Sequence, residues 1–227
     1  MNLVFEGFGR DERITEDKSQ WFSPPDLAFR MWRWAGSIRR EARILEPAAG
    51  SGNLVQAARM NRSESGDELR SLRAITAHEI DPYYVDRLRE RFAGDDLTTI
   101  AAGSYLDAPA PEVRYDLGFA NPPFEDGLDG EFLAKMLDEC DRVIALVRLV
   151  ALAGSERHRR VWSRIGQDWH MPGLAIFPAR PSFIAGRAVG GREESGSAKA
   201  DFCVVKLSRV GGGETAMEWR SEEHTSE

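Results

Sequence analysis

The sequence predicts an α/β fold in which a doubly wound, mostly parallel sheet carries helices on both faces. Short apolar segments alternate with segments whose apolar residues recur every three or four positions, as strands and crossover helices do. The first apolar segment also runs into a glycine turn that a helix follows. With 227 residues, of which 42% are hydrophobic and 30% charged, the chain can bury one large core in a single domain.

The first elements follow from prolines and apolar spacing. Residues 1–20 form a charged N-terminal segment, and a helix is expected over residues 26–37, where two prolines precede a stripe of apolar side chains. An apolar run over residues 43–46 stops at Pro47, and residues 53–60 are expected to be helical after the turn. This stretch is therefore expected to be a strand, a glycine turn and a helix.

The same alternation continues along the rest of the chain. A strand over residues 75–80 ends in acidic residues, and Pro82 begins an amphipathic helix. The other expected strands cover residues 97–102, 115–120, 142–152, 174–177 and 201–207, and the other expected helices cover residues 130–140 and 155–165. With the first strand, these make a seven-stranded sheet.

The domain is expected over residues 21–210, followed by a tail over residues 211–227. Residues 220–227 are polar, have no apolar period and resemble the translation of a sequencing-library adapter, so we do not expect them to belong to the fold.

Composition excludes several classes of protein. The net charge of −7 argues against a generally basic nucleic-acid-binding surface but leaves a local one open. Cys140 and Cys203 lie far apart, and the histidines lack the spacing of zinc ligands, so we expect neither a disulfide framework nor a metal site. No apolar stretch reaches the roughly 18 residues of a membrane span. We therefore expect no membrane association and a cytoplasmic location.

The first strand ends in a turn that is suited to a nucleotide-like ligand. Ligands of open parallel sheets bind at the carboxyl ends of the strands, and Gly50 and Gly52 let the backbone approach one closely. At the end of the next strand, the Glu79 carboxylate can accept hydrogen bonds from both hydroxyls of a ribose, with Asp81 as the second candidate. The alternatives are an ordinary tight turn and a solvated acid at a strand end.

The most informative stretch is Asn121-Pro122-Pro123-Phe124, directly after a predicted strand. The prolines have fixed φ and no amide donor, so they can hold the side-chain carbonyl of Asn121 and the backbone carbonyl of Pro122 toward one small space. Two such acceptors suit an exocyclic amino group, and Phe124 offers a ring on which a base can stack. The alternative is a strand that ends at proline, with asparagine as a turn residue.

These motifs together resemble the S-adenosylmethionine-dependent amino-methyltransferases, particularly the DNA adenine methyltransferases. The resemblance implies a Rossmann-like, class I methyltransferase fold and S-adenosylmethionine as cofactor. It implies cofactor contacts from the segment before the first helix, the glycine turn and the second strand end: Ser23, Pro24, Glu46, Pro47, Ala48, Gly50, Gly52 and Glu79. After the third strand the family has an acidic residue and an aromatic that contact adenine. Here Ser104 and Tyr105 take those places, and Asp107 is an alternative acceptor.

A second resemblance covers residues 177–183, which are similar to a segment of small phage-type adenine methyltransferases. It implies that Phe183 packs on a base flipped out of the duplex, as a partner of Phe124, and that Arg180 meets a phosphate. The alternatives are core packing for Phe183 and a surface salt bridge for Arg180. A group of arginines on one predicted helix and in a later loop could form a local positive face or merely a solvated helix face: Arg157, Arg159, Arg160, Arg164, Arg187 and Arg192.

The expected activity is direct methyl transfer to the exocyclic amino group of adenine in DNA, with the target base flipped out. The same chemistry on a cytosine amino group, an RNA guanine or a protein glutamine is the nearest alternative. A catalytically inactive scaffold that binds nucleic acid or a partner is the alternative of another class. The sequence fixes no oligomeric state, and a monomer is compatible with it.

Overall fold

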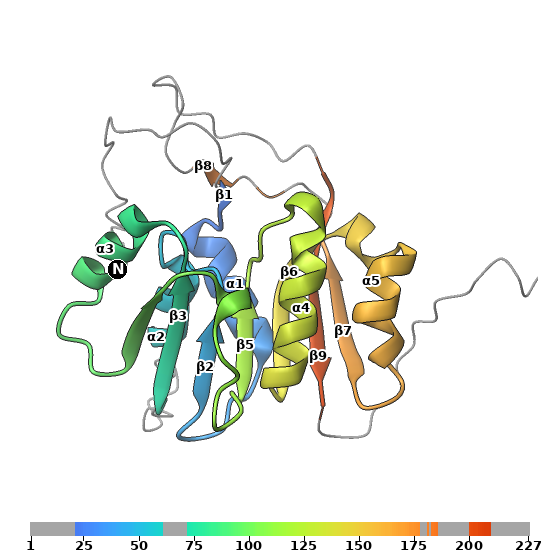
Figure 1. The fold of residues 1–227 in the computed structure, drawn as a ribbon, viewed down its shortest axis with the longest axis horizontal. Helices are drawn as coiled ribbons and strands as arrows, with labels where there is room; N and C mark the ends of the chain where they lie inside the picture. The colour runs from blue at the N-terminus through green and yellow to red at the C-terminus, as the bar shows by residue number, and fades with distance from the viewer. Residues whose placement is uncertain (1–20, 61–71, 178–180, 182, 186–199, 210–227) are drawn as a thin grey trace, which may run out of the picture.

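A single seven-stranded sheet forms the centre of the molecule (Figure 1). The computed structural model describes residues 21–60, 72–177, 181, 183–185 and 200–209. The strands are β2 (Arg43–Glu46), β3 (Ala74–Glu79), β4 (Thr98–Ala102), β5 (Leu117–Ala120), β6 (Arg142–Arg148), β7 (His170–Ile176) and β9 (Phe202–Ser208). Their order is β4-β3-β2-β5-β6-β9-β7, and β9 runs antiparallel to both of its neighbours while the other pairs are parallel. The predicted fold class is confirmed.

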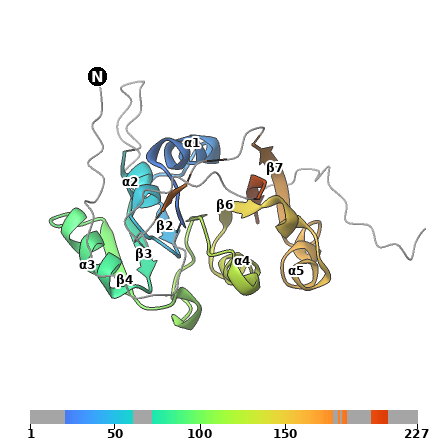
Figure 2. The ribbon, with the colours of Figure 1, turned by 90° about the horizontal axis from the view of Figure 1, so that it is seen from above.

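Helices cover both faces of this sheet. They are α1 (Pro25–Ala35), α2 (Asn53–Arg59), α3 (Pro82–Arg91), α4 (Leu128–Glu139) and α5 (Ser155–Arg160). Seen from above, α1 and α2 lie on one side of the strands, and α4 and α5 lie on the other (Figure 2). Within the described part of the chain, no helix has the length and apolar character that crossing a membrane requires.

The double covering explains why the central strands β5 and β6 are apolar along almost their whole length. In β6, Ile144 and Leu146 belong to the core cluster that α1 and α2 share, whereas Val143, Ala145 and Val147 belong to the cluster under α4. Because successive side chains of a strand point to opposite faces, each residue of a doubly covered strand must be apolar. The two clusters hold the central strands rigidly, and so fix where their carboxyl ends emerge.

Several predicted boundaries are wrong. The strand predicted over residues 142–152 ends at Arg148 and continues as a 3₁₀ helix, and the helix predicted over residues 155–165 ends at Arg160. The cause of the second break is tertiary, because the indole of Trp162 turns inward and donates a hydrogen bond to the Ala151 carbonyl, 2.8 Å away. The 3₁₀ helices are Tyr105–Asp107, Glu125–Gly127, Leu149–Leu152 and Trp162–Arg164.

A short antiparallel pair was not predicted. It joins β1 (Trp21–Phe22) to β8 (Ile184–Ala185). In Figure 1 this pair lies over the upper edge of the sheet, close to the start of α1. It brings the segment before α1 across the edge where the parallel strands end.

Candidate active site

The turn after β2 is held by close packing on both sides. Gly50 and Gly52 have φ angles of +52° and +81°, in the left-handed region that favours glycine. A Cβ on Gly50 would lie 2.5 Å from the ring of Phe22, and one on Gly52 would lie 2.7 Å from a methyl group of Leu88. The fold itself therefore requires both glycines. Arg91 adds a hydrogen bond to the Asn53 side chain, at 3.1 Å.

Two buried carboxylates flank this turn. Glu79 accepts hydrogen bonds from the amides of Gly50, at 2.7 Å, and Asp81, at 2.8 Å, one on each oxygen. Glu46 accepts one from the amide of Ala48, at 3.0 Å, while its second oxygen is buried without a partner. Burial raises the pKa of Glu46 to about 8, against the lowering effect of the Ala48 amide and with a further rise from Glu79. The pKa of Glu79 is also raised by burial, and its amide donors limit the rise.

The two residues after Glu79 differ in their surroundings: Asp81 caps a helix, and Ile80 exposes an apolar side chain. Asp81 accepts a hydrogen bond from the Tyr83 amide, at 2.9 Å, and so caps the N-terminus of α3. Ile80, which the sequence reasoning missed, is 57% exposed at the carboxyl end of β3. Its signal in the sequence is a large apolar residue placed between two acidic ones, where a polar side chain would otherwise be expected.

The structure does not support the predicted adenine contact of Tyr105. Its ring is only 2% exposed and lies in the core under α4. Its hydroxyl donates a hydrogen bond to the Glu139 carboxylate, at 2.9 Å, which turns the side chain away from the edge of the sheet. Ser104 accepts from the Leu106 amide, at 3.2 Å, and caps the 3₁₀ helix, while Asp107 is exposed.

The asparagine corner lies next to the glycine turn, as predicted. Asn121 follows β5, and its amide nitrogen donates to the hydroxyl of Ser23, at 3.0 Å. The carbonyl of the same serine accepts from the side chain of Asn53, at 3.0 Å, so Ser23 links the two loops. The side-chain oxygen of Asn121 is buried without a partner. Pro122 is buried behind it, Pro123 is partly buried, and Pro24 precedes α1 as its N-cap residue.

Phe124 belongs to a row of aromatic rings, but its predicted partner does not face it. The rings of Phe124 and Phe183 each pack edge-on against Phe202, at centroid distances of 5.2 and 5.0 Å. Phe183 is 4% exposed and lies in the core. Because Phe183 is buried, it offers no exposed ring to a base, and core packing describes it. Arg180 lies outside the described residues.

Of the two interpretations of the arginines around α5, the structure favours a solvated helix face over a positive one, while Arg187 and Arg192 lie outside the described residues. Carboxylates, several of them from α4, neutralise the arginines around α5. The pairs are Arg157–Asp129 at 3.0 Å, Arg159–Glu156 at 2.7 Å, Arg160–Glu156 at 2.6 Å and Arg164–Asp138 at 2.8 Å. Of these carboxylates only Asp129 is fully buried, so the other pairs mainly cancel charge at the surface.

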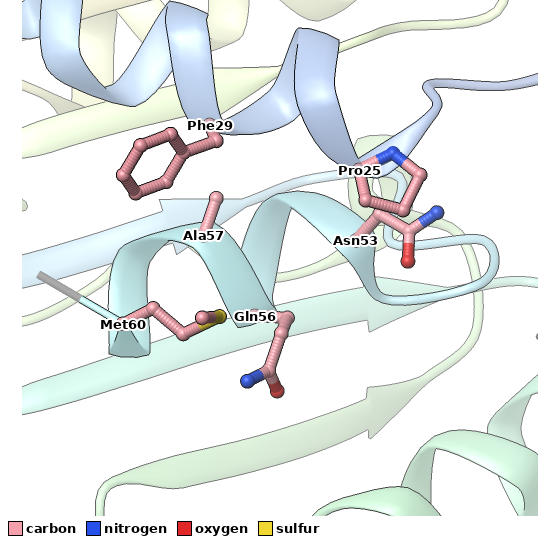
Figure 3. Close-up of a pocket in the computed structure, with 6 residues that line it drawn as sticks. All are labelled: Pro25, Phe29, Asn53, Gln56, Ala57 and Met60. Carbon is pink, nitrogen blue, oxygen red and sulfur yellow. The ribbon is translucent and has the colours of Figure 1, made fainter. Parts of the chain in front are cut away.

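A separate hollow lies between α1 and α2 (Figure 3). Its volume of about 20 Å³ leaves room for little more than a water molecule. It is lined by Pro25, Phe29, Asn53, Gln56, Ala57 and Met60. Neither Glu79 nor Asn121 borders it, so it is distinct from the edge where the predicted site residues meet.

Two relatives align with more than half of the chain. An rRNA methyltransferase of Streptomyces thermotolerans is 30% identical over 128 residues, and the ribosomal RNA small subunit methyltransferase A of Parasynechococcus marenigrum is 30% identical over 139 residues. These alignments cover 54% and 59% of the chain but only 37% and 42% of the relatives, so the chain spans less than half of their length. No protein family model matches the chain.

Solved structures show the fold. A class I S-adenosylmethionine-dependent methyltransferase (putative) from Listeria monocytogenes matches 87% of the chain and 64% of its own length, with a TM-score of 0.64 and 14% identity. A putative RNA methyltransferase from Pyrococcus horikoshii matches 84% of the chain and 87% of its own length, with a TM-score of 0.58 and 18% identity. A modification subunit of a putative type I restriction enzyme from Vibrio vulnificus matches 84% and 45%, with a TM-score of 0.63 and 14% identity. The chain has the class I methyltransferase fold.

Proposed function

We propose that the protein is an S-adenosylmethionine-dependent methyltransferase that modifies the exocyclic amino group of adenine in a nucleic acid. One observation carries this proposal: the side-chain oxygen of Asn121 is a buried acceptor with no partner among the described residues, and Ser23 links Asn121 to the glycine turn. Buried acceptors are nearly always satisfied. An incoming amino group would satisfy this one, at the edge of the sheet where a nucleotide-like cofactor binds.

The residues around the glycine turn fit S-adenosylmethionine. Each oxygen of Glu79 accepts one amide and keeps a lone pair for a ribose hydroxyl. The unpartnered oxygen of Glu46 is an acceptor for the positively charged methionine part. Ile80 offers the exposed apolar surface against which adenine can pack, in place of the buried Tyr105.

When bound, S-adenosylmethionine supplies a methyl group on a positively charged sulfur. Asn121, with the Pro122 carbonyl as the predicted second acceptor, would hold the two amino protons of the target base. This would aim the nitrogen lone pair at the methyl group and favour the positive charge that the nitrogen gains on attack. Phe124 would fix the plane of the base by stacking. The transfer would be direct: the bond from the methyl group to sulfur would break as the bond to nitrogen forms, a neutral thioether would leave, and the surplus amino proton would pass to water, so no covalent enzyme intermediate is needed.

RNA is the favoured substrate, because both aligned relatives are named as ribosomal RNA methyltransferases. DNA is the second candidate. It is favoured by the resemblance of the motifs around Glu46, Glu79 and Asn121 to DNA adenine methyltransferases, and by the likeness to the type I modification subunit. For either polymer, a paired adenine would have to leave its duplex to reach Asn121.

Methyl transfer from tritiated S-adenosylmethionine tests the proposal. The protein is incubated separately with ribosomal RNA, DNA and an unrelated protein, and each polymer is digested so that the labelled product can be identified. We expect N6-methyladenine from a nucleic acid. Label on cytosine, guanine or glutamine would overturn the adenine assignment, and tight cofactor binding without transfer to any polymer would favour an inactive scaffold.

A further inference from the structure

Arg148 stands at the carboxyl end of β6, next to the asparagine corner, and none of the predicted roles involves it. Its guanidinium donates a hydrogen bond to the backbone carbonyl of Phe124. The central carbon of the same guanidinium lies 5.7 Å from the centroid of the Phe124 ring, within the range of a cation–π contact. One side chain thus contacts both the backbone and the ring of the residue that follows the two prolines.

A second side chain also supports the Phe124 ring. Phe202, which is paired with Arg148 across the β6–β9 ladder, packs edge-on against the Phe124 ring, with the ring centroids 5.2 Å apart. Phe124 is therefore held by a cation and by a neighbouring aromatic ring. No carboxylate pairs with Arg148 in the part of the chain that the structure describes, whereas the four arginines around α5 are all paired.

The lack of a carboxylate partner matters for what Arg148 does. An ion pair would draw the guanidinium toward the acid and weaken its attraction to the ring. Instead, Arg148 donates one hydrogen bond to the Phe124 carbonyl, and its Nε is buried with no partner among the described residues. A buried donor left unsatisfied costs free energy, which the bond to the Phe124 carbonyl and the contact with its ring have to offset.

We propose that Arg148 is a positioning residue that fixes the angle of the Phe124 ring and thereby the plane of the target base beside Asn121. This inference rests on the proposed function. Because the planar guanidinium of Arg148 holds both the ring and the backbone carbonyl of Phe124, a shift of the carbonyl also moves the ring, and a shift of the ring also moves the carbonyl. A small tilt of the ring would carry the amino group away from the Asn121 oxygen.

Arg142 offers a matched control. It lies at the opposite end of the same strand and, like Arg148, its guanidinium donates to backbone carbonyls, those of Ala35 and Ser37. The variants Arg148→Met and Arg142→Met each remove from the same strand a guanidinium that donates hydrogen bonds to the backbone. Only Arg148→Met removes one next to Asn121. Arg148→Lys keeps the charge over the ring and loses the planar fork that reaches the carbonyl.

The first measurement is steady-state methyl transfer together with cofactor affinity by calorimetry. For Arg148→Met we expect kcat to fall about 100-fold, the scale of a misplaced reacting group, with the cofactor Kd within about twofold of wild type. Arg148→Lys should recover part of the loss, and Arg142→Met should leave kcat near wild type. Wild-type kcat in Arg148→Met, or an equal loss in both Met variants that follows their melting temperatures, would overturn the proposal.

A second measurement is independent of activity. A 4-fluorophenylalanine placed at position 124 reports the ring environment by ¹⁹F NMR. Arg148→Met should shift and broaden the resonance, and Arg142→Met should not. If the wild-type protein methylates no nucleic acid but this shift is seen, the positioning of Phe124 stands and the proposed function fails. An unchanged resonance in Arg148→Met would refute the positioning itself.

Discussion

The two halves of the candidate site differ in how far they are completed by the protein itself. In the cofactor half, around β2 and β3, both oxygens of Glu79 accept backbone amides, and the glycine turn packs against Phe22 and Leu88. In the substrate half, around β5 and β6, the Asn121 oxygen and the Arg148 Nε are buried without partners. The first half is largely satisfied as it stands, and the second leaves polar groups for a ligand to satisfy.

This difference predicts which substitutions should weaken cofactor binding and which should slow methyl transfer. Groups that already bond to the protein hold a loop in shape, so their loss weakens a binding surface. A group that has no partner contributes little to the resting fold, so its loss should appear mainly when substrate arrives. Glu46 is the exception within the cofactor half, because its second oxygen is unpartnered as well.

The largest effect is expected at Asn121. Asn121→Ala removes the buried acceptor, and we expect kcat to fall at least about 10³-fold, as when a preorganised polar group that stabilises developing charge is lost. The cofactor Kd should stay within a few fold, because the glycine turn is untouched. Gln56→Ala, which removes an amide on α2 outside the site, serves as the control. Activity retained in Asn121→Ala would break the division between the halves.

Glu79 should show the opposite pattern. Glu79→Gln places an amino group where one oxygen now accepts an amide, so it disturbs the turn and removes an acceptor for ribose. The loss of charged hydrogen bonds, roughly 1.5–3 kcal/mol each, predicts a cofactor Kd weakened about 30-fold, with kcat at saturation changed little.

Glu139→Gln is the matched control for Glu79→Gln, because Glu139 is also a buried carboxylate but is the last residue of α4, bonded to Tyr105. It should lower the melting temperature without changing the cofactor Kd. If the two variants weakened cofactor binding equally, Glu79 would have no special role in the site.

The raised pKa of Glu46 predicts that cofactor binding depends on pH. Its pKa of about 8 in the folded protein means that the carboxyl is mostly protonated at pH 6. A positively charged ligand favours the carboxylate, so binding below pH 8 would release a proton. The cofactor Kd should therefore fall by up to about tenfold per pH unit from pH 6 toward pH 8 and level off above. Isothermal titration calorimetry in buffers of different ionisation enthalpy measures the released proton.

Glu46→Gln separates this effect from titration of the cofactor's own amino group. In the variant, the cofactor Kd should depend less steeply on pH, because the contribution of Glu46 to that dependence is lost. Without cofactor, a pKa raised on folding from about 4.5 to about 8 makes the wild-type fold progressively less stable as pH rises from about 4.5 to about 8, with no further loss above. The melting temperature of Glu46→Gln should fall less over that range. If the cofactor Kd depended equally on pH in the wild type and in Glu46→Gln, Glu46 would have no role in cofactor binding.

Much of the fold and the approximate site were predictable from the sequence, for one physical reason. Parallel strands that are covered on both faces are continuously apolar, and their carboxyl ends meet at one edge. That is enough to bring Glu79 and Asn121 to the same side. The Ser23 link between the glycine turn and Asn121 confirms that these two loops are neighbours.

The failures share a different cause, which is contact between elements far apart in the chain. Tyr105 was expected at the adenine, but Glu139 of α4 binds its hydroxyl and draws the ring into the core. Arg157 was expected to belong to a positive or a solvated helix face, but the buried Asp129 of α4 pairs with it. Arg148 was read as part of an apolar strand, because its contact with Phe124 has no local signature. Side-chain direction in each case depends on a partner that local patterns do not reveal.

The smallest effect is expected at Ser23, on the boundary between the halves. Its hydroxyl accepts the Asn121 amide, which leaves the carbonyl end of that amide as the free acceptor. Ser23→Ala should lower kcat by up to about tenfold, the scale of one net hydrogen bond, and Ser23→Thr should restore it. If Ser23 acts through Asn121, the cofactor Kd will not move. If it contacts the methionine part directly, as its resemblance to the family implies, the Kd will weaken while kcat holds, and Ser23 then belongs to the cofactor half.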